Sequence, residues 1–271
     1  LIKCDLTLAS GVLYDTGFGT SKRNNGARHG GGIRRMTVWG NRSANPAATA
    51  KDRNNAGSGI VAIAARNIFV EECFSMMWAD DGINAGTHDY GTGLIGVNVG
   101  TFRDNTVMSN SRDGWGGTLG DSRISGGTAG FNGRHGLCMY LGNTVVLGMT
   151  SWNNGYGGFY CSGMVESSQG SLVGCFAYDN DGYGFMLDGA GGGRAAMLQS
   201  CNSRGNGRNS LGAYSAVSDK SNYVVTSTAV HWALLGCASN SYDQGNVLTV
   251  ACGYYISNWT HHGRFEACAD D

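Results

Sequence analysis

The stretch NGRHGL, residues 132–137, is one copy of a short motif that recurs along the chain. The motif is an asparagine, three variable residues, a glycine or serine, and a large apolar residue. Copies begin at Asn55, Asn110, Asn132, Asn154, Asn180 and Asn206, and Trp78 takes the asparagine position of one more. From Asn110 onward they follow one another after 22, 22, 26 and 26 residues. Repeats of this length cannot bury an apolar face alone, so the motif predicts a solenoid of stacked coils.

The residues that precede each asparagine keep the same register from copy to copy. Eight positions before it lie the apolar residues Val70, Phe102, Ile124, Val146, Leu172 and Leu198. Short segments such as NTVVLGMT (143–150) and GSLVGCFAY (170–178) have the composition of strands and are bounded by turn residues. We find no 3.6-residue periodicity of the kind that helical repeats require. The pattern predicts an all-β chain, a parallel β-helix with coils of about 22–26 residues.

The composition suits this fold and limits the classes of function. The chain of 271 residues contains 46 glycines and one proline, which fits tight turns and, without a three-residue period, excludes collagen. Its formal net charge is -1 and no basic block occurs, so we expect no nucleic-acid partner. No apolar run approaches ~20 residues, so we expect no membrane span.

The extent of the repeat suggests how the chain is divided. Residues 1–250 are predicted to form the β-helix domain, and residues 251–271, which break the repeat, a C-terminal capping or interface segment. The chain opens without methionine inside the strand-like sequence IKCDLTL (2–8). We therefore expect an N-terminally truncated fragment or a processed chain.

The strand followed by Asn-x-x-x-Gly-apolar, coil after coil, resembles the pectate-lyase-like superfamily of right-handed parallel β-helices over roughly residues 33–250. The segments IRRMTVWGN (33–41) and SGIVAIAARNIFVEEC (58–73) are similar to the first coils of phage tailspike and exopolysaccharide depolymerase β-helices. The resemblance implies a right-handed coil, a polysaccharide substrate and a homotrimer. It also implies a place in the virion tail, outside the cell, after assembly in the cytoplasm. Such a fold does not by itself determine an activity.

Two residue types are expected to form structural columns in the stack. Cys73, Cys175 and Cys201 share the position five residues before the motif, and Cys237 follows the same register. We expect stacked free thiols and no metal site, with a disulfide between Cys175 and Cys201 as the alternative. The asparagines are expected to form a ladder, because stacked carboxamides bond to one another.

Chemistry is expected in the two residues before the glycine, which vary among the copies. In three successive copies these pairs are Asp80-Asp81, Arg112-Asp113 and Arg134-His135. Stacking places Asp81, Asp113 and His135 in one column, with the carboxylates roughly 5 Å apart. Turn positions in a solenoid are expected to be exposed, so one interpretation is a solvated polar face without further function.

The favoured function is that of a tailspike-type depolymerase, which hydrolyses the glycosidic bonds of a bacterial surface or extracellular polysaccharide. Glycosidases need two carboxyl groups, one of which a close like charge keeps protonated. Asp80, Asp81 and Asp113 can supply this pair, as acid and as base or nucleophile. His135 is predicted to assist by relaying a proton or orienting a carboxylate.

Two other functions fit the same residues. A uronate lyase needs a base for the C5 proton, for which His135, Tyr156 or Arg134 would serve. It also needs a cation at the carboxylate, supplied by Arg112 or by Ca²⁺ on the three aspartates. Apart from this Ca²⁺, no cofactor is predicted. The other alternative is a non-catalytic glycan-binding or structural tail β-helix.

A second set of residues is predicted to bind the polysaccharide. These residues are Arg112, Arg134, His88, Asp89, Tyr90, Tyr156 and Trp152. The arginines suit an acidic sugar, and Trp152 is expected to face outward as a stacking platform. Residues 88–90 belong to the insertion NAGTHDYGTG (84–93), and residues 42–56 form another insertion. Long loops on a rigid scaffold commonly carry binding residues, so both are expected near a cleft.

Overall fold

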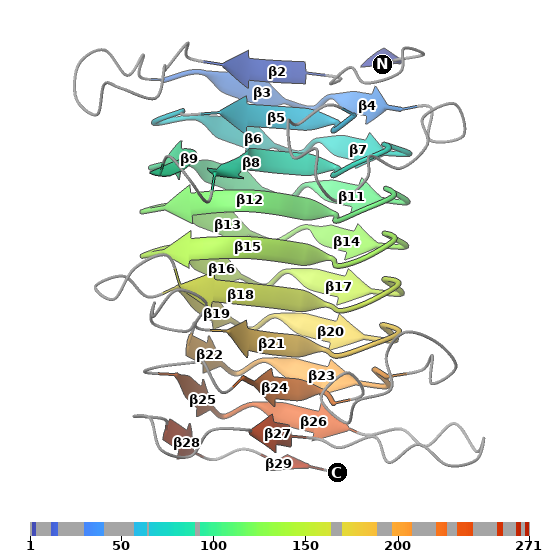
Figure 1. The fold of residues 1–271 in the computed structure, drawn as a ribbon, viewed down its shortest axis with the longest axis vertical. Coiled ribbons are helices and arrows are strands. Elements are labelled where there is room, and N and C mark those ends of the chain that lie inside the picture. The colour runs from blue at the N-terminus through green and yellow to red at the C-terminus, as the bar shows by residue number, and fades with distance from the viewer. Residues whose placement is uncertain are drawn as a thin grey trace.

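A computed structural model describes residues 2–3, 12–15, 30–40, 57–63, 65–89, 93–163, 170–188, 197–207, 221–226, 232–240, 254–256, 264–266 and 269–270. Within these ranges the regular structure consists of β-strands, and no helix suited to crossing a membrane occurs there. The strands form three sheets that run along a solenoid, with one coil stacked on the next (Figure 1). The prediction of an all-β chain folded as a parallel β-helix is confirmed.

Each typical coil adds one strand to sheet C, then one to sheet A and one to sheet B. Sheet A contains β1 (Ile2–Lys3), β4 (Thr37–Trp39), β7 (Phe74–Met76), β11 (Thr106–Met108), β14 (Thr128–Gly130), β17 (Thr150–Trp152), β20 (Phe176–Tyr178), β23 (Asn202–Arg204), β26 (Ala238–Asn240) and β29 (Ala269–Asp270). Sheet B contains β2 (Val12–Asp15), β5 (Ile60–Ile63), β8 (Ile83–Asp89), β9 (Gly93–Asn98), β12 (Trp115–Gly120), β15 (Leu137–Gly142), β18 (Phe159–Gly163), β21 (Phe185–Asp188), β24 (Tyr223–Val225) and β27 (Tyr254–Ile256). Sheet C contains β3 (Gly32–Arg34), β6 (Phe69–Glu71), β10 (Thr101–Arg103), β13 (Arg123–Ser125), β16 (Val145–Leu147), β19 (Ser171–Val173), β22 (Met197–Gln199), β25 (Ala233–Leu235) and β28 (Arg264–Glu266).

The core consists of columns of apolar side chains. Phe102 of β10 pairs with Ile124 of β13, which pairs with Val146 of β16, and all three are buried. In sheet B the rings of Phe159 and Phe185 stack with their centroids 4.7 Å apart and their planes at 4°. Because the coils lie in register, one apolar position in the repeat becomes a continuous column. Burial of each such side chain contributes about 1.5–3 kcal/mol.

The asparagines form the predicted ladder at the turn between sheets A and B. Asn132 Oδ1 accepts hydrogen bonds from the backbone N–H and the side-chain amide of Asn110, at 3.2 and 2.9 Å. Asn154 makes the same two bonds to Asn132, and Asn180 makes them to Asn154. Ser109, just before the ladder, has a left-handed backbone with a φ of 56°. The ladder satisfies backbone N–H groups that this turn takes out of the sheets.

The cysteines of the predicted column are buried free thiols. The described cysteines, which form no disulfide with one another, are Cys73, Cys138, Cys161, Cys175, Cys201 and Cys237. Cys175 Sγ donates a weak hydrogen bond to the carbonyl oxygen of Val146, at 3.6 Å. The expected stack of thiols is therefore present, without a disulfide among the described residues. Cys138 differs from the rest, because it alternates with buried residues of β15 and lies half-buried on the outer face of sheet B.

The insertion that begins at Asn84 forms a β-hairpin where the sequence suggested a binding loop. Strand β8 runs on to Asp89 and pairs antiparallel with β9, with His88 opposite Leu94. Because the two strands of the insertion pair with each other, their backbone N–H and C=O groups are hydrogen-bonded within the hairpin. The structure does not describe Tyr90, the side chains of His88 and Asp89, or the other insertion at residues 42–56.

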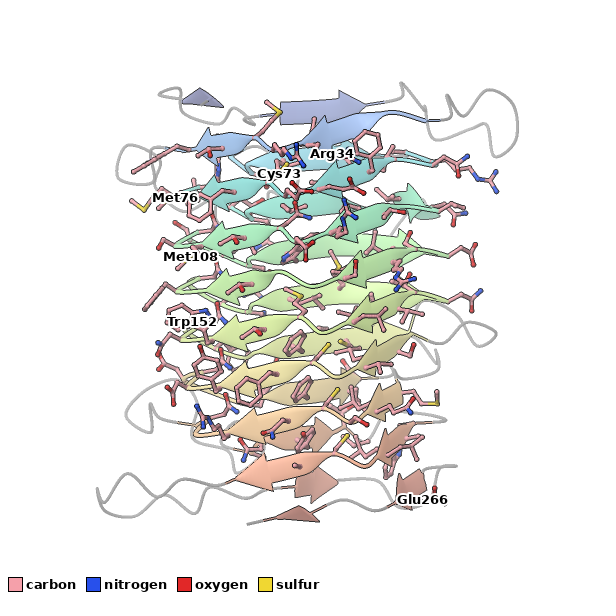
Figure 2. All side chains as sticks on the ribbon, turned by 180° about the vertical axis from the view of Figure 1, so that it is seen from behind. Arg34, Cys73, Met76, Met108, Trp152 and Glu266 are labelled. Atoms are coloured by element: carbon pink, nitrogen blue, oxygen red, sulfur yellow. The ribbon has the colours of Figure 1, made fainter. Side chains whose placement is uncertain are left out.

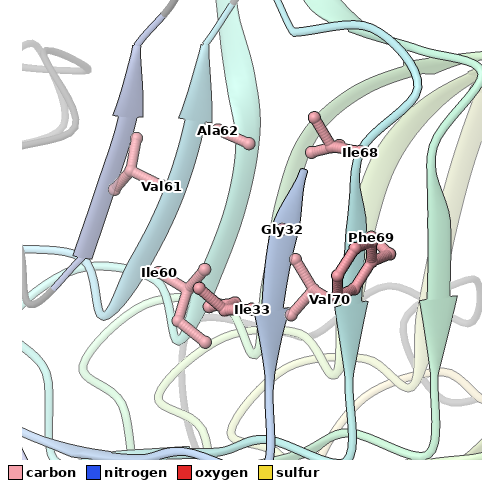
Figure 3. A pocket seen from close by; sticks show the side chains of 8 residues that line it. All are labelled: Gly32, Ile33, Ile60, Val61, Ala62, Ile68, Phe69 and Val70. Atoms are coloured by element: carbon pink, nitrogen blue, oxygen red, sulfur yellow. The ribbon is translucent and has the colours of Figure 1, made fainter. Parts of the chain in front are cut away.

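The two ends of the described chain continue the same three sheets. Strands β27, β28 and β29 pair in parallel with β24, β25 and β26, one in each sheet (Figure 1). Residues after 250 break the sequence repeat, yet these strands still add to the stack. Near the N-terminal end a cavity of about 20 Å³ lies between β3, β5 and β6, lined by apolar side chains such as Ile33 and Ile60 (Figure 3). A cavity of this size holds no sugar ring.

Candidate active site

The polar column that the motif predicts is present. Asp81, Asp113 and His135 lie on three successive coils, in the turns that lead from sheet A into sheet B. The Gly82 N–H donates to the carbonyl oxygen of Asp113 at 3.1 Å, and the Gly114 N–H donates to that of His135 at 2.8 Å. Strands β8, β12 and β15 begin two residues later and pair in register, so the sheet holds the three residues in line.

The prediction that these side chains are exposed to solvent is wrong. Asp80, Asp81 and Asp113 are 0% exposed and His135 is 2% exposed. The carboxylates turn along the stack and accept hydrogen bonds from the next coil. Asp81 Oδ1 accepts from the Asp113 N–H at 3.2 Å, and Asp113 Oδ1 accepts from the His135 N–H at 3.0 Å. Backbone N–H donors stabilise a carboxylate that is removed from water, so these aspartates can be buried in a turn. The sequence of the turn does not reveal these donors, because they belong to the next coil.

A glycine in sheet B makes room for the first carboxylate. Gly116 of β12 lies next to Asp81, and a methyl group added at Gly116 would collide with Asp81 Oδ2. A residue larger than glycine would therefore displace the carboxylate from the stack. The same position holds Asn84 one coil earlier and Cys138 one coil later.

Arg112 lies among three buried carboxylates. Its Nη1 is 2.8 Å from Asp80 Oδ1, its Nε is 3.7 Å from Asp81 Oδ1, and its Nη2 is 3.6 Å from Asp113 Oδ2. The side chain is 16% exposed, so the guanidinium is committed to these aspartates. It also lies where a Ca²⁺ shared by the three carboxylates would have to lie. The aspartates therefore do not fit the calcium site considered for a lyase.

Two carboxyl groups of the column have opposite pKa shifts. Burial, followed by the charge of Asp80, raises the pKa of Asp81 to about 8. Burial acts the same way on Asp113, but His135 and two neighbouring arginines outweigh it and lower the pKa of Asp113 to about 2. At neutral pH Asp113 is therefore ionised and Asp81 is largely protonated.

Asn84 provides the partner that a protonated Asp81 requires. Its Nδ2 lies 2.8 Å from Asp81 Oδ2, and its buried Oδ1 has no hydrogen-bond partner. A half-turn of the amide exchanges these two atoms with little change of shape. Asn84 can thus donate to the carboxylate or accept from the carboxylic acid. The repeat does not mark Asn84 as part of the site, because its contact with Asp81, three residues earlier on the same coil, depends on the direction of the two side chains.

His135 is oriented by Asp113. Its Nδ1 lies 2.8 Å from Asp113 Oδ1. Because Asp113 is ionised, Nδ1 carries the proton and donates it in this bond. In the neutral form of this tautomer Nε2 bears the lone pair, and this buried atom has no hydrogen-bond partner. A histidine held in this tautomer by a carboxylate has the properties of a general base.

Tyrosine rings pack around the histidine. The ring centroids of Tyr156, Tyr160 and Tyr183 lie 4.9, 5.9 and 5.9 Å from that of His135. Tyr183 is fully buried, and its hydroxyl has no hydrogen-bond partner. Of these three tyrosines, Tyr156 was predicted from the sequence as a site residue, and the other two were not. The available signal was Gly157, which has no side chain and so admits the Tyr183 ring from the following coil.

The other predicted binding residues have different surroundings. Arg134 is 39% exposed and its Nε lies 4.0 Å from Asp113 Oδ1, so this cation borders the column and also reaches solvent. Trp152 belongs to sheet A, and its ring stacks on Tyr178 at 5.9 Å and 11°. Figure 2 shows it in line with Met108 and Met76 along one side of the solenoid. Trp152 is thus on another sheet from the column, while the side chains at 88–90 are outside the described residues.

Solved structures with the same architecture include two polysaccharide-modifying modules. The A-module of mannuronan C-5 epimerase AlgE4 from Azotobacter vinelandii is 19% identical, with a TM-score of 0.56, over 77% of this chain and 51% of that one. The A-module of mannuronan C-5 epimerase AlgE6 from the same organism is 14% identical, with a TM-score of 0.54, over 89% of this chain and 73% of that one. The chain thus spans about half the length of the first structure. No protein-family model and no curated protein sequence matches. At these identities the likeness establishes the fold, a right-handed parallel β-helix.

Proposed function

We propose that this chain acts on a uronate-containing polysaccharide and removes the C5 proton of a uronate residue, with His135 as the base. The observation that carries the proposal is the bonding of the imidazole. Asp113 holds Nδ1, while Nε2 is buried without a hydrogen-bond partner. A lone pair that the protein itself does not use is available to a substrate proton.

The chemistry of C5 explains why a cation is needed beside the base. The C5 hydrogen of a uronate lies next to a carboxylate, and it becomes acidic only when that carboxylate's charge is neutralised. Arg134 is the arginine of the column with exposed surface, so it is the residue we assign to the sugar carboxylate. Arg112 holds the aspartates and takes no part in this contact.

Two reactions share this first step. Loss of the substituent at C4 gives β-elimination, whereas return of a proton to the opposite face of C5 gives epimerisation. The second course needs a proton donor across the sugar ring from His135, and the hydroxyls of Tyr156 and Tyr183 are candidates. The two similar structures are mannuronan C-5 epimerase modules, and mannuronan is a uronate polymer, which supports epimerisation.

The substrate must reach a histidine that is 2% exposed. The half-buried ring of Tyr156 packs over the imidazole, with the ring centroids 4.9 Å apart. We infer that this side chain moves aside when the sugar binds, since a rotamer change of a partly exposed ring is fast on the timescale of catalysis.

The test is deuterium incorporation at C5 when the protein acts on mannuronan, alginate or polygalacturonate in D2O. We expect exchange with the wild type and a loss of about 10²–10⁴-fold in His135→Gln. Glutamine can still donate to Asp113, so this variant keeps the stack and lacks the base. Exchange that persists in His135→Gln overturns the role of His135. Absence of exchange with all three polymers overturns C5 chemistry on these uronates.

Hydrolysis is the second candidate, because the pKa values of Asp81 and Asp113 lie near 8 and 2. Glycosidases use such a difference in pKa to keep one carboxyl group protonated as the acid and the other ionised as the base or nucleophile. Hydrolysis would release reducing ends without deuterium at C5 and without the ultraviolet absorbance of an unsaturated product. Binding without either change would identify a non-catalytic glycan-binding β-helix. The trimer and the virion-tail location stay predictions, and light scattering tests the first.

A further inference from the structure

We infer that Asp113, His135 and Cys138 form a binding site for a soft divalent ion of the Zn²⁺ class, and that the bound ion switches off His135 as a base. The binding half of this inference is independent of the proposed function, whereas the regulatory half rests on it. The three residues each offer one ligand atom, and these atoms all lie within 4.8 Å of one another.

The β-helix brings the three ligands together on one side of sheet B. His135 and Cys138 are three residues apart at the start of β15, and Asp113 comes from the preceding coil. The glycine contact described above shows that a carboxylate in this turn lies against the next coil's residue in sheet B: Asp81 against Gly116. Asp113 stands one coil further on, and there the corresponding residue is Cys138.

The cysteine occurs at one level of this stack. On the preceding coil the residue in register with Cys138 is Gly116, and on the following coil it is Tyr160. Neither carries a thiol. Cys138 is also set apart from the other described cysteines, which are buried, whereas Cys138 is half-buried on the outer face of the sheet.

Unused bonding capacity in the cluster is the independent observation that points to a ligand. His135 Nε2 and Asp113 Oδ2 are buried and have no hydrogen-bond partner, and Asp113 Oδ2 has an ion pair with Arg112 Nη2 at 3.6 Å. The two side chains are 1% and 3% exposed. Buried polar atoms are normally paired, since an unpaired one costs about 1–3 kcal/mol. An ion that takes one carboxylate oxygen and one imidazole nitrogen would remove part of this cost.

The set of donor atoms selects the class of ion. One oxygen, one nitrogen and one sulfur atom suit Zn²⁺ or Co²⁺, whereas Ca²⁺ and Mg²⁺ prefer oxygen alone. A carboxylate and a thiolate offset the two charges of a divalent cation, beside the guanidinium groups of Arg112 and Arg134 that also face Asp113. Ligand atoms of a tetrahedral zinc ion lie about 3.5 Å apart, so the side chains need to close by about 1 Å.

The proposed metal ion would bind the same two side chains, Asp113 and His135, that form the proposed catalytic base and its partner. A metal bound to the imidazole takes up a ring lone pair, and a metal bound to Asp113 weakens the hydrogen bond that fixes the tautomer. The vacant fourth position of the ion is filled by water. We therefore expect the metal-loaded protein to have lost C5 proton exchange.

The test starts with titration of the metal-free full chain with Co²⁺ and Zn²⁺. A cobalt–thiolate bond gives a charge-transfer absorption band in the near ultraviolet, which reports the sulfur ligand directly. We expect the band in the wild type, its loss in Cys138→Ser, and its retention in Cys161→Ala, which removes a buried thiol of the next coil. A band that survives in Cys138→Ser overturns the site, and so does absence of binding to the wild type.

Proton exchange then tests the regulatory half. We expect Zn²⁺ to abolish deuterium incorporation in the wild type and to leave Cys138→Ser active. Binding through Cys138 without loss of exchange overturns the switch. If the metal-free wild type shows no exchange, the proposed function fails and the switch fails with it. The binding half is still decided by the cobalt band.

Discussion

Two columns of polar side chains run through the same turns, three residues apart on each coil, and they differ in how completely they are bonded. In the asparagine ladder, the amide of Asn132 accepts from Asn110 and donates to Asn154. In the neighbouring column, Asp113 Oδ2 and His135 Nε2 have no hydrogen-bond partner. Stacking on backbone N–H groups explains why both columns are buried. This difference is the reason why we assign the proposed chemistry to the second column.

Charge is the second difference between the columns. The ladder is neutral and needs no counter-ion, so it can extend over many coils at little cost. The column gathers three carboxyl groups around the single guanidinium of Arg112. Desolvation of so many ionisable groups is costly, and Arg112 together with the protonation of Asp81 offsets it. A charged stack is therefore confined to a few coils, whereas the ladder is not.

The largest effect should follow removal of the cation from the charged column. We expect Arg112→Met to lower the free energy of unfolding at pH 7 by about 3–5 kcal/mol, because it leaves buried carboxylates without a counter-charge. Urea denaturation measures this loss. Arg103→Met is the matched control, since its side chain is 45% exposed and its partners Glu71 and Glu72 keep their ion pairs with Arg34 and Arg35, so a loss below about 1 kcal/mol is expected. Equal losses would contradict the burial of the charge cluster.

A smaller loss is expected from the neutral column. Asn154→Ala removes the acceptor of two donors on Asn132 and should cost about 2–3 kcal/mol in the free energy of unfolding. Asn202→Ala serves as the control, because Asn202 is exposed on β23 and its replacement should change stability by less than about 0.5 kcal/mol. Unlike the loss in Arg112→Met, the loss in Asn154→Ala should not diminish in acid. A strong pH dependence would show that the two columns are coupled.

The residues that make up the two columns can be predicted from the sequence, because residues one repeat apart become neighbours on successive coils of a parallel β-helix. Asn110, Asn132 and Asn154 recur at the coil length, so their stacking needs no information beyond the repeat. The same holds for the column of Asp81, Asp113 and His135. The column to which a residue belongs depends only on its place in the repeat, and the repeat can be recognised in the sequence.

The direction and environment of the side chains could not be predicted in the same way. Burial of Asp81 depends on Gly116 in the next coil, and the ring of Tyr183 reaches His135 because Gly157 leaves a gap between them. The first contact joins different positions of the repeat on neighbouring coils, and the second joins the same position two coils apart, across a residue without a side chain. The hairpin of β8 and β9 was missed for a related reason, since its pairing is antiparallel and lies outside the repeat.

The effect most specific to the charged column concerns the proton on Asp81, and for each pH unit it is smaller than either of the two losses above. Its pKa is about 8 in the folded chain and near 3.8 in the unfolded chain, so the folded state holds an extra proton between these values. Its contribution to stability is complete below about pH 4 and is lost as the pH rises through 8, by at most about 1.4 kcal/mol per pH unit. Asp81→Asn, which resembles the protonated acid, should match the wild type below about pH 4 and exceed it increasingly as the pH rises toward 8. Asp113, with a pKa of about 2, has the opposite dependence, so Asp113→Asn should remove a loss of stability below pH 4. A stability difference between Asp81→Asn and the wild type that stays constant across this range would mean that Asp81 is ionised in the fold and that its proton does not offset the charge of the column.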